Sequence, residues 1–139
     1  MSVAPKGLEF TSSAVSELEI ISSAVNEILD LSLTAFWADD LKAASMVEPL
    51  EQVIDVLKEQ MRTRHILRLQ QGLCSIDAGF IWADLLTNLE RTSDHCSNIA
   101  GCVIDMAQGN MNIHEMLRET RNSSEDFRQK YKAFAGKYL

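Results

Sequence analysis

The sequence is poor in residues that interrupt regular structure. Its 139 residues include only six Gly and two Pro, too few for a disordered chain or for an all-β protein rich in turns. Long apolar runs are also missing, because Ser, Asp, Asn or Arg recurs every few positions. No stretch approaches the roughly 18 to 20 apolar residues that span a bilayer. We therefore expect no direct membrane insertion.

Cysteine and positive charge are scarce as well. The three cysteines, Cys74, Cys96 and Cys102, form no CxxC pair, and no signal peptide precedes them, which favours a reducing, cytoplasmic location. Lys and Arg number 13 against 20 Asp and Glu, for a formal net charge of -7. Such a surface repels phosphate backbones, so we expect no nucleic-acid partner, and cations are the more natural small ligands.

What is abundant favours one helical domain. Apolar residues make up 46% of the chain, enough for a single core at this length. Leu, Ala, Met, Glu, Lys and Gln favour helix. Residues 1–9 carry Pro5 and Gly7 and are expected to be a leader or a cut end. Residues 10–139 are expected to form the one domain.

Apolar spacings of three and four predict three long helices. The first covers residues 10–37. The second is expected to start near Met46, because Ser45 and Glu48 fit an S-x-x-E capping box, and to end before Gly72. The third is expected over residues 78–107. Trp82, Cys96 and Cys102 lie on its apolar stripe and, together with Trp37 of the first helix, are expected to pack inside the bundle.

The C-terminal residues predict a short helical extension over residues 113–139. We expect one helical piece at 113–119 and, after a capping signal at 122–125, a terminal helix with its aromatic side chains on one face. Long helices joined by short links pack antiparallel. The predicted fold class is therefore all-α, an antiparallel three-helix bundle with spectrin-like up-down topology and a short C-terminal helical extension.

Two pairs of carboxylates stand four residues apart, Glu51 with Asp55 and Glu90 with Asp94. Side chains at this spacing project from the same face of a helix, about 6 Å apart. If the second and third helices are antiparallel neighbours, the four carboxylates can converge on one point. We call these four residues the acidic face.

Clustered carboxylate oxygens suit Mg²⁺, Mn²⁺, Ca²⁺ or iron, with Zn²⁺ a weaker choice. Lys58 and Arg62 lie on the same side of the second helix, and Arg62 or Arg91 could neutralise the carboxylates instead. His95 is either a flanking ligand or a surface residue. No Glu is followed three residues later by His, which argues against a ferritin-like di-iron site. No hydrolase or nucleotide-binding motif is present, so we do not expect an enzyme.

The stretch from Asp84 to Ala100 contains E-R-T-S-D-H-C-S-N-I-A, which resembles the E-R-x-x-D-H-x-x-N-I-A pattern of the PhoU family. The segment E-P-L-E-Q-V-I-D, from Glu48 to Asp55, resembles the first acidic motif of that family. The resemblance implies divalent or ferric ions (Fe, Mn, Mg or Zn) as cofactors. It implies a ligand set with the following members: Glu51, Asp55, Glu90 and Asp94, with His95 and Asn98 in support.

The resemblance also implies a role. A single three-helix repeat with a helical tail looks most like the C-terminal PhoU domain of bacterial Na⁺/phosphate cotransporters. The implied function is metal-binding regulation of phosphate transport at the inner face of the cell membrane. The implied partners are the membrane portion of the transporter, or phosphate-transport and signalling proteins, with a homodimer as a further expectation. The alternative is a plain helical protein-interaction domain whose acidic face is solvated and binds no metal.

Overall fold

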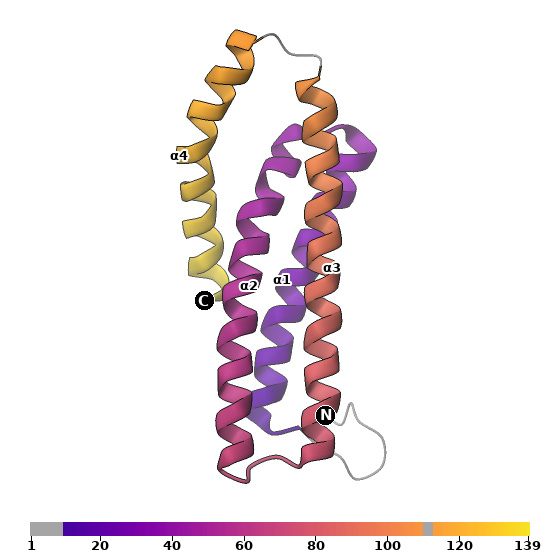
Figure 1. Cartoon of the computed structure of the whole chain (residues 1–139), viewed down its shortest axis with the longest axis vertical. Helices are drawn as coiled ribbons and strands as arrows, with labels where there is room; N and C mark the ends of the chain where they lie inside the picture. Colours follow the sequence, from indigo (N-terminus) through magenta and orange to yellow (C-terminus); the bar gives the residue numbers. More distant parts are fainter. Residues whose placement is uncertain (1–9, 110–112) are drawn as a thin grey trace.

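The computed structural model describes residues 10–109 and 113–139, and the side chains of residues 10–109 and 125–139. The described chain forms four helices: α1 (Ser12–Ala38), α2 (Leu41–Gln70), α3 (Ile76–Gln108) and α4 (Ile113–Tyr138). Successive helices run in opposite directions, and α4 lies against α2 (Figure 1). The predicted all-α bundle is confirmed. The predicted leader, residues 1–9, lies outside the described residues.

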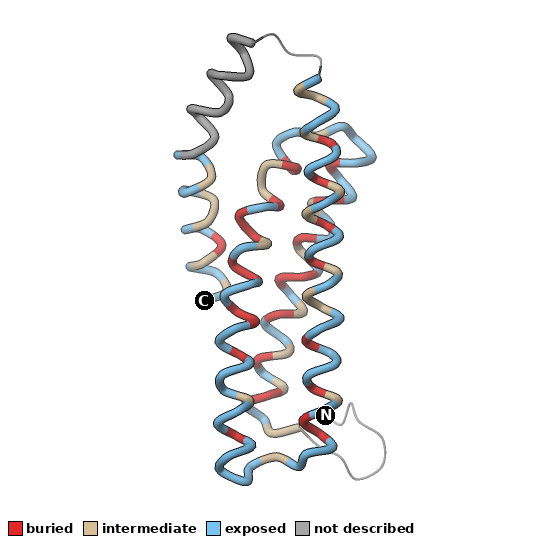
Figure 2. Tube along the Cα trace, in the orientation of Figure 1, coloured by how far each residue is buried: buried red, intermediate tan, exposed pale blue. Residues whose placement is uncertain are grey.

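The core lies between α1, α2 and α3, whose buried residues fall on the faces turned toward one another (Figure 2). Spacings of three and four place these side chains on one stripe of each helix. The largest side chains that are fully buried are the following: Trp82, Ile21, Ile28, Leu50, Ile54, Met61, Leu86, Val47 and Val53.

Most helix ends follow from local sequence. The Thr11 hydroxyl caps α1 by accepting the backbone N–H of Ala14 at 3.1 Å, and the Ser75 hydroxyl caps α3 through Ala78 at the same distance. Gly72 ends α2 with a φ of 70°, a left-handed conformation that glycine adopts without a Cβ penalty. These ends agree with the predicted ones.

The predicted start of α2 is wrong. The helix begins five residues before Met46, where the Asp40 carboxylate accepts the backbone N–H groups of Lys42 and Ala43 at 3.0 and 3.1 Å. Ser45 lies inside the helix, and its hydroxyl donates to the carbonyl of Lys42. The additional N-terminal residues of α2 include Ala43 and Ala44, which are buried. Their burial favours a helix that begins well before Pro49.

The C-terminal extension is one helix of 26 residues where two pieces were predicted. Phe134 is buried, and Tyr131 and Tyr138 pack against the core. The Tyr138 hydroxyl donates to Glu27 of α1, and Lys137 donates to the same carboxylate at 2.9 Å. The tail is therefore a fourth helix held to α2 and α1 by packing and polar contacts.

Two residues expected in the bundle interior lie outside it. Trp37 is 79% exposed in the last turn of α1, where its ring meets Phe36 edge-on, because Ala35 is the residue of that turn that faces the core. Cys102 is exposed on α3, whereas Cys96 and Trp82 are buried as predicted. Over the described residues, no helix has the length and hydropathy needed to cross a membrane.

Candidate cation site between α2 and α3

Antiparallel packing of α2 and α3 brings the two carboxylate pairs side by side. Glu51 of α2 lies within hydrogen-bonding distance of Asp94 of α3. Further along α2, the Lys58 ammonium lies 2.6 Å from Glu90 of α3. Residue numbers therefore rise along α2 while they fall along α3. This register places the acidic face along a single helix–helix contact.

The Glu51–Asp94 half of the face has an excess of negative charge. Partial burial, together with the negative charges of Asp55, Glu48 and Asp94, raises the pKa of Glu51 to about 7. A hydrogen bond with Asp94 favours the protonated form of Glu51 in the same direction. Near neutral pH, Glu51 is therefore partly protonated, at a place where a bound cation could take the position of the proton.

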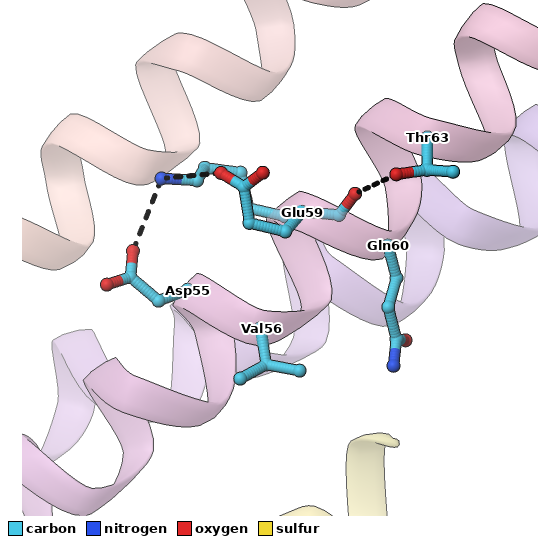
Figure 3. A pocket seen from close by; sticks show the side chains of 6 residues that line it. Asp55, Val56, Glu59, Gln60 and Thr63 are labelled. Atoms are coloured by element: carbon cyan, nitrogen blue, oxygen red, sulfur yellow. Dashed lines mark hydrogen bonds and ion pairs between the residues drawn. The ribbon is translucent and has the colours of Figure 1, made fainter.

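The Asp55–Glu90 half already has a positive charge. The Lys58 Nζ lies 2.6 Å from Glu90 Oε1, 3.3 Å from Asp55 Oδ1 and 3.7 Å from Glu59 Oε1. Figure 3 shows Asp55 and Glu59 reaching toward this one ammonium nitrogen beside a shallow hollow on α2. Burial acts to lower the pKa of Lys58, but the hydrogen bond to Glu90 and the charge of Asp55 outweigh burial and raise it.

The neighbouring polar residues occupy different positions. The Glu48 carboxylate accepts a hydrogen bond of 2.6 Å from Ser97, so it links α2 to α3 and is not the capping residue that the sequence suggested. His95 and Asn98 are both exposed on α3, next to Asp94 and one turn after it. Their supporting role stays a prediction.

Within residues 10–109 and 125–139, no three His, Cys, Asp or Glu side chains are arranged to hold a metal ion as they stand. The four predicted ligands lie on one face but in two halves: one contains Glu51 with its raised pKa, and the other is neutralised by Lys58. The ligand set of Glu51, Asp55, Glu90 and Asp94 stays a prediction.

A second polar cluster was missed by the sequence analysis. Arg68 Nη1 lies 2.6 Å from Glu17 Oε2, and both side chains are buried. The Arg68 guanidinium also lies over the ring of Trp82, on which His65 stacks at 4.6 Å. Burial and the charge of Arg68 lower the pKa of His65. A signal for this cluster did exist, because Glu17 falls between Ala14 and Ile21 on the apolar stripe of α1.

Residues 18–103 match the model of the PhoU domain. The matched residues are more than half of the chain and include both carboxylate pairs. The chain belongs to the PhoU family. The PhoU match covers the three-helix bundle, and α4 follows it.

One curated relative illustrates how far the likeness extends. This PhoU domain is 26% identical over 109 residues to the phosphate-specific transport system accessory protein PhoU homolog 1 of Thermotoga maritima. The alignment covers 78% of this chain and 47% of the relative, so the chain spans about half the length of that protein. No solved structure matches the chain.

Proposed function

We propose that this chain is a PhoU-type regulator of phosphate transport that binds a cation between α2 and α3 and acts through protein contact. The observation that carries this proposal is the PhoU match over residues 18–103, the part that holds the acidic face. The name of the Thermotoga relative, a phosphate transport accessory protein, supports the same role. The proposal contains no catalytic step.

The Glu51–Asp94 half fits a divalent or ferric ion by its chemistry. Its donors are carboxylate oxygens, which suit Mg²⁺, Mn²⁺ and iron and accept Zn²⁺. Burial and the neighbouring carboxylates Asp55, Glu48 and Asp94 raise the pKa of Glu51, so a cation placed there would meet negative charge that is only partly solvated. Glu51 and Asp94 would hold the ion, with Glu48 within reach of the same charge. A bound cation would supply the positive charge that now comes from a proton, and would join α2 to α3.

The Asp55–Glu90 half favours the alternative function. Lys58 already satisfies both carboxylates, as expected of a helical interaction domain that binds no metal. Under this alternative the acidic face meets basic residues of a partner protein. Saturable Mn²⁺ binding separates the two functions, because a solvated acidic face binds ions only weakly.

For the cellular context, we propose the cytoplasmic domain of a Na⁺/phosphate cotransporter, at the inner face of the membrane. A three-helix repeat followed by a further helix, as α1–α3 and α4 are arranged here, supports this context. The partners would be the membrane portion of the transporter or other phosphate-transport proteins, and a homodimer is a further proposal. Loss of the gene should change the rate of phosphate uptake, and an unchanged rate would contradict the regulatory role.

Metal analysis and calorimetric titration test the site directly. We expect Asp55→Ala combined with Asp94→Ala to abolish Mn²⁺ binding while helicity, measured by circular dichroism, stays nearly unchanged. The matched control is Asp30→Ala with Asp84→Ala, because both residues are exposed carboxylates outside the face. Equal metal in the wild type and the site variant would overturn the assignment.

A further inference from the structure

Lys58 has an unusual position for a lysine on a helix surface. Its side chain is only 10% exposed, whereas Arg62, one turn later on α2, is 47% exposed and lies 3.4 Å from Glu59. Lysine is almost never fully buried unless it is paired. The long stem of Lys58 thus directs its ammonium into the contact between α2 and α3.

The ammonium is held by carboxylates from both helices. Asp55 and Glu59 approach it from α2, and Glu90 approaches it from α3 at 2.6 Å. At this position a single positive charge is attracted by Asp55 and Glu90 at the same time. A second cation there would meet the charge of Lys58 at close range, and two like charges in a partly buried site repel each other strongly at short distance.

We propose that Lys58 is a built-in cation that fills the Asp55–Glu90 half of the acidic face and limits ion binding to the Glu51–Asp94 half. Lys58 would thereby set the number of ions that this PhoU domain takes. The inference rests on the proposed metal-binding role for its biological meaning. The geometry that carries it is separate, because it involves the other half of the face.

Replacing Lys58 with an uncharged residue of similar length tests the inference. In Lys58→Met the stem remains apolar and helix-compatible, while Asp55 and Glu90 lose their cation. We expect titration with Mn²⁺ to show one more bound ion per chain than the wild type, with the count confirmed by metal analysis after gel filtration. Lys58→Gln should give the same gain and serves if Lys58→Met does not fold.

Two control variants test whether the gain depends on losing the positive charge at position 58 in particular. Arg62→Met removes one positive charge from the same side of α2 but leaves Lys58 in place, so it should bind the wild-type number of ions. Lys58→Arg keeps a positive charge at the position and should also bind the wild-type number. An equal ion count in Lys58→Met, Lys58→Gln and Arg62→Met would overturn the inference.

The outcomes also separate this inference from the proposed function. If the wild type binds no Mn²⁺ and Lys58→Met binds one ion, Lys58 excludes the ion as inferred and the Glu51–Asp94 site is wrong. If Asp94→Asn loses the wild-type ion and Lys58→Met gains none, the Glu51–Asp94 site stands and the role of Lys58 is wrong.

Discussion

Two basic side chains of this PhoU domain, Lys58 and Arg68, occupy buried positions. Each is stabilised there by carboxylates, because burying an unpaired charge costs several kcal/mol. Arg68 meets the single carboxylate of Glu17, whereas Lys58 meets carboxylates from two helices. Glu51 is the opposite case, a half-buried acid among other acids, and its pKa rises to about 7. At the scale of residues, a buried charge is kept where an opposite charge lies beside it, and a buried carboxyl group among other carboxylates has a raised pKa.

The raised pKa of Glu51 makes stability depend on pH. An unfolded glutamate titrates near pH 4.3, so from about pH 4 to 7 the folded chain keeps a proton that the unfolded chain releases. This stabilisation is complete below the unfolded pKa and is lost as the pH rises through 7. We expect the free energy of unfolding of Glu51→Gln, relative to wild type, to rise by about 2 kcal/mol from pH 5 to pH 8.

Urea unfolding at several pH values with EDTA present measures this difference without bound metal. Glu19→Gln is the matched control, since Glu19 is an exposed carboxylate on α1, and its difference from wild type should stay constant. A constant difference for Glu51→Gln as well would show that Glu51 titrates normally.

The Glu17–Arg68 pair predicts strong coupling between two mutations. Removing one partner leaves a buried charge, so Glu17→Leu or Arg68→Met alone should cost about 3 kcal/mol of unfolding free energy. The double variant removes both charges and retains apolar volume, and should cost much less than the sum of the two. Chemical denaturation of all four proteins gives the coupling energy. Additive losses would mean that the two charges do not stabilise each other.

At the scale of elements, α2 shows how packing extends a helix beyond its strongest sequence signal. The S-x-x-E pattern at Ser45 and Glu48 indicated a start, but both side chains have other partners: Glu48 accepts from Ser97, and Ser45 accepts from Lys130 of α4 at 2.6 Å. The cap is supplied by Asp40, the residue after Asp39, whose φ of 50° ends α1. Asp39 and Asp40 therefore form the tight turn that joins α1 to α2.

Capping by Asp40 predicts a loss on truncation. Asp40→Ala should lower the free energy of unfolding by about 1 kcal/mol, because two backbone N–H groups at the start of α2 lose their acceptor. Ser45→Ala, which removes the hydroxyl of the predicted capping box, should cost less. Thermal or urea unfolding of both variants measures the difference. A larger loss for Ser45→Ala would support the capping box instead.

At the scale of the whole molecule, α4 closes the fold by lying along α2 (Figure 1). Phe134 reaches the core, and the polar contacts of Lys137 and Tyr138 with Glu27 attach the end of the chain to α1. The PhoU match ends at residue 103, before this helix. The fourth helix is thus outside the matched region but inside the packed structure.

If α4 belongs to the cooperative unit, a change on α4 should destabilise the whole bundle. Phe134→Ala should lower the unfolding free energy by about 3 kcal/mol and shift the urea midpoint observed at the buried Trp82, in the contact of α2 with α3. The indole NMR signal of Trp82 provides this local readout. Lys132→Ala, an exposed change on α4, should leave the midpoint in place. An unshifted midpoint in Phe134→Ala would show that α4 unfolds separately.

Much of the fold and part of the candidate site could be predicted. Apolar periodicity located all three bundle helices, since each had to bury one stripe, and the i, i+4 rule placed each carboxylate pair on one face. Periodicity did not show that α4 is continuous, because polar residues near Asn122 and Ser123 resemble a cap. Periodicity also did not predict that Lys58 pairs with Glu90, since a flexible side chain on that face can reach solvent just as easily.

The sequence by itself determined the helical class, the PhoU motifs and the two carboxylate pairs, because these depend on spacings within one helix. Only the tertiary structure decided how the pairs are used. The register of α2 against α3 joins Glu51 to Asp94 and inserts Lys58 between Asp55 and Glu90. The packing of α1 against α2 likewise buries Glu17 against Arg68, 51 residues later. Such contacts join residues that only the packing of whole helices brings within a few ångströms, where charges interact strongly enough to pair or to shift a pKa.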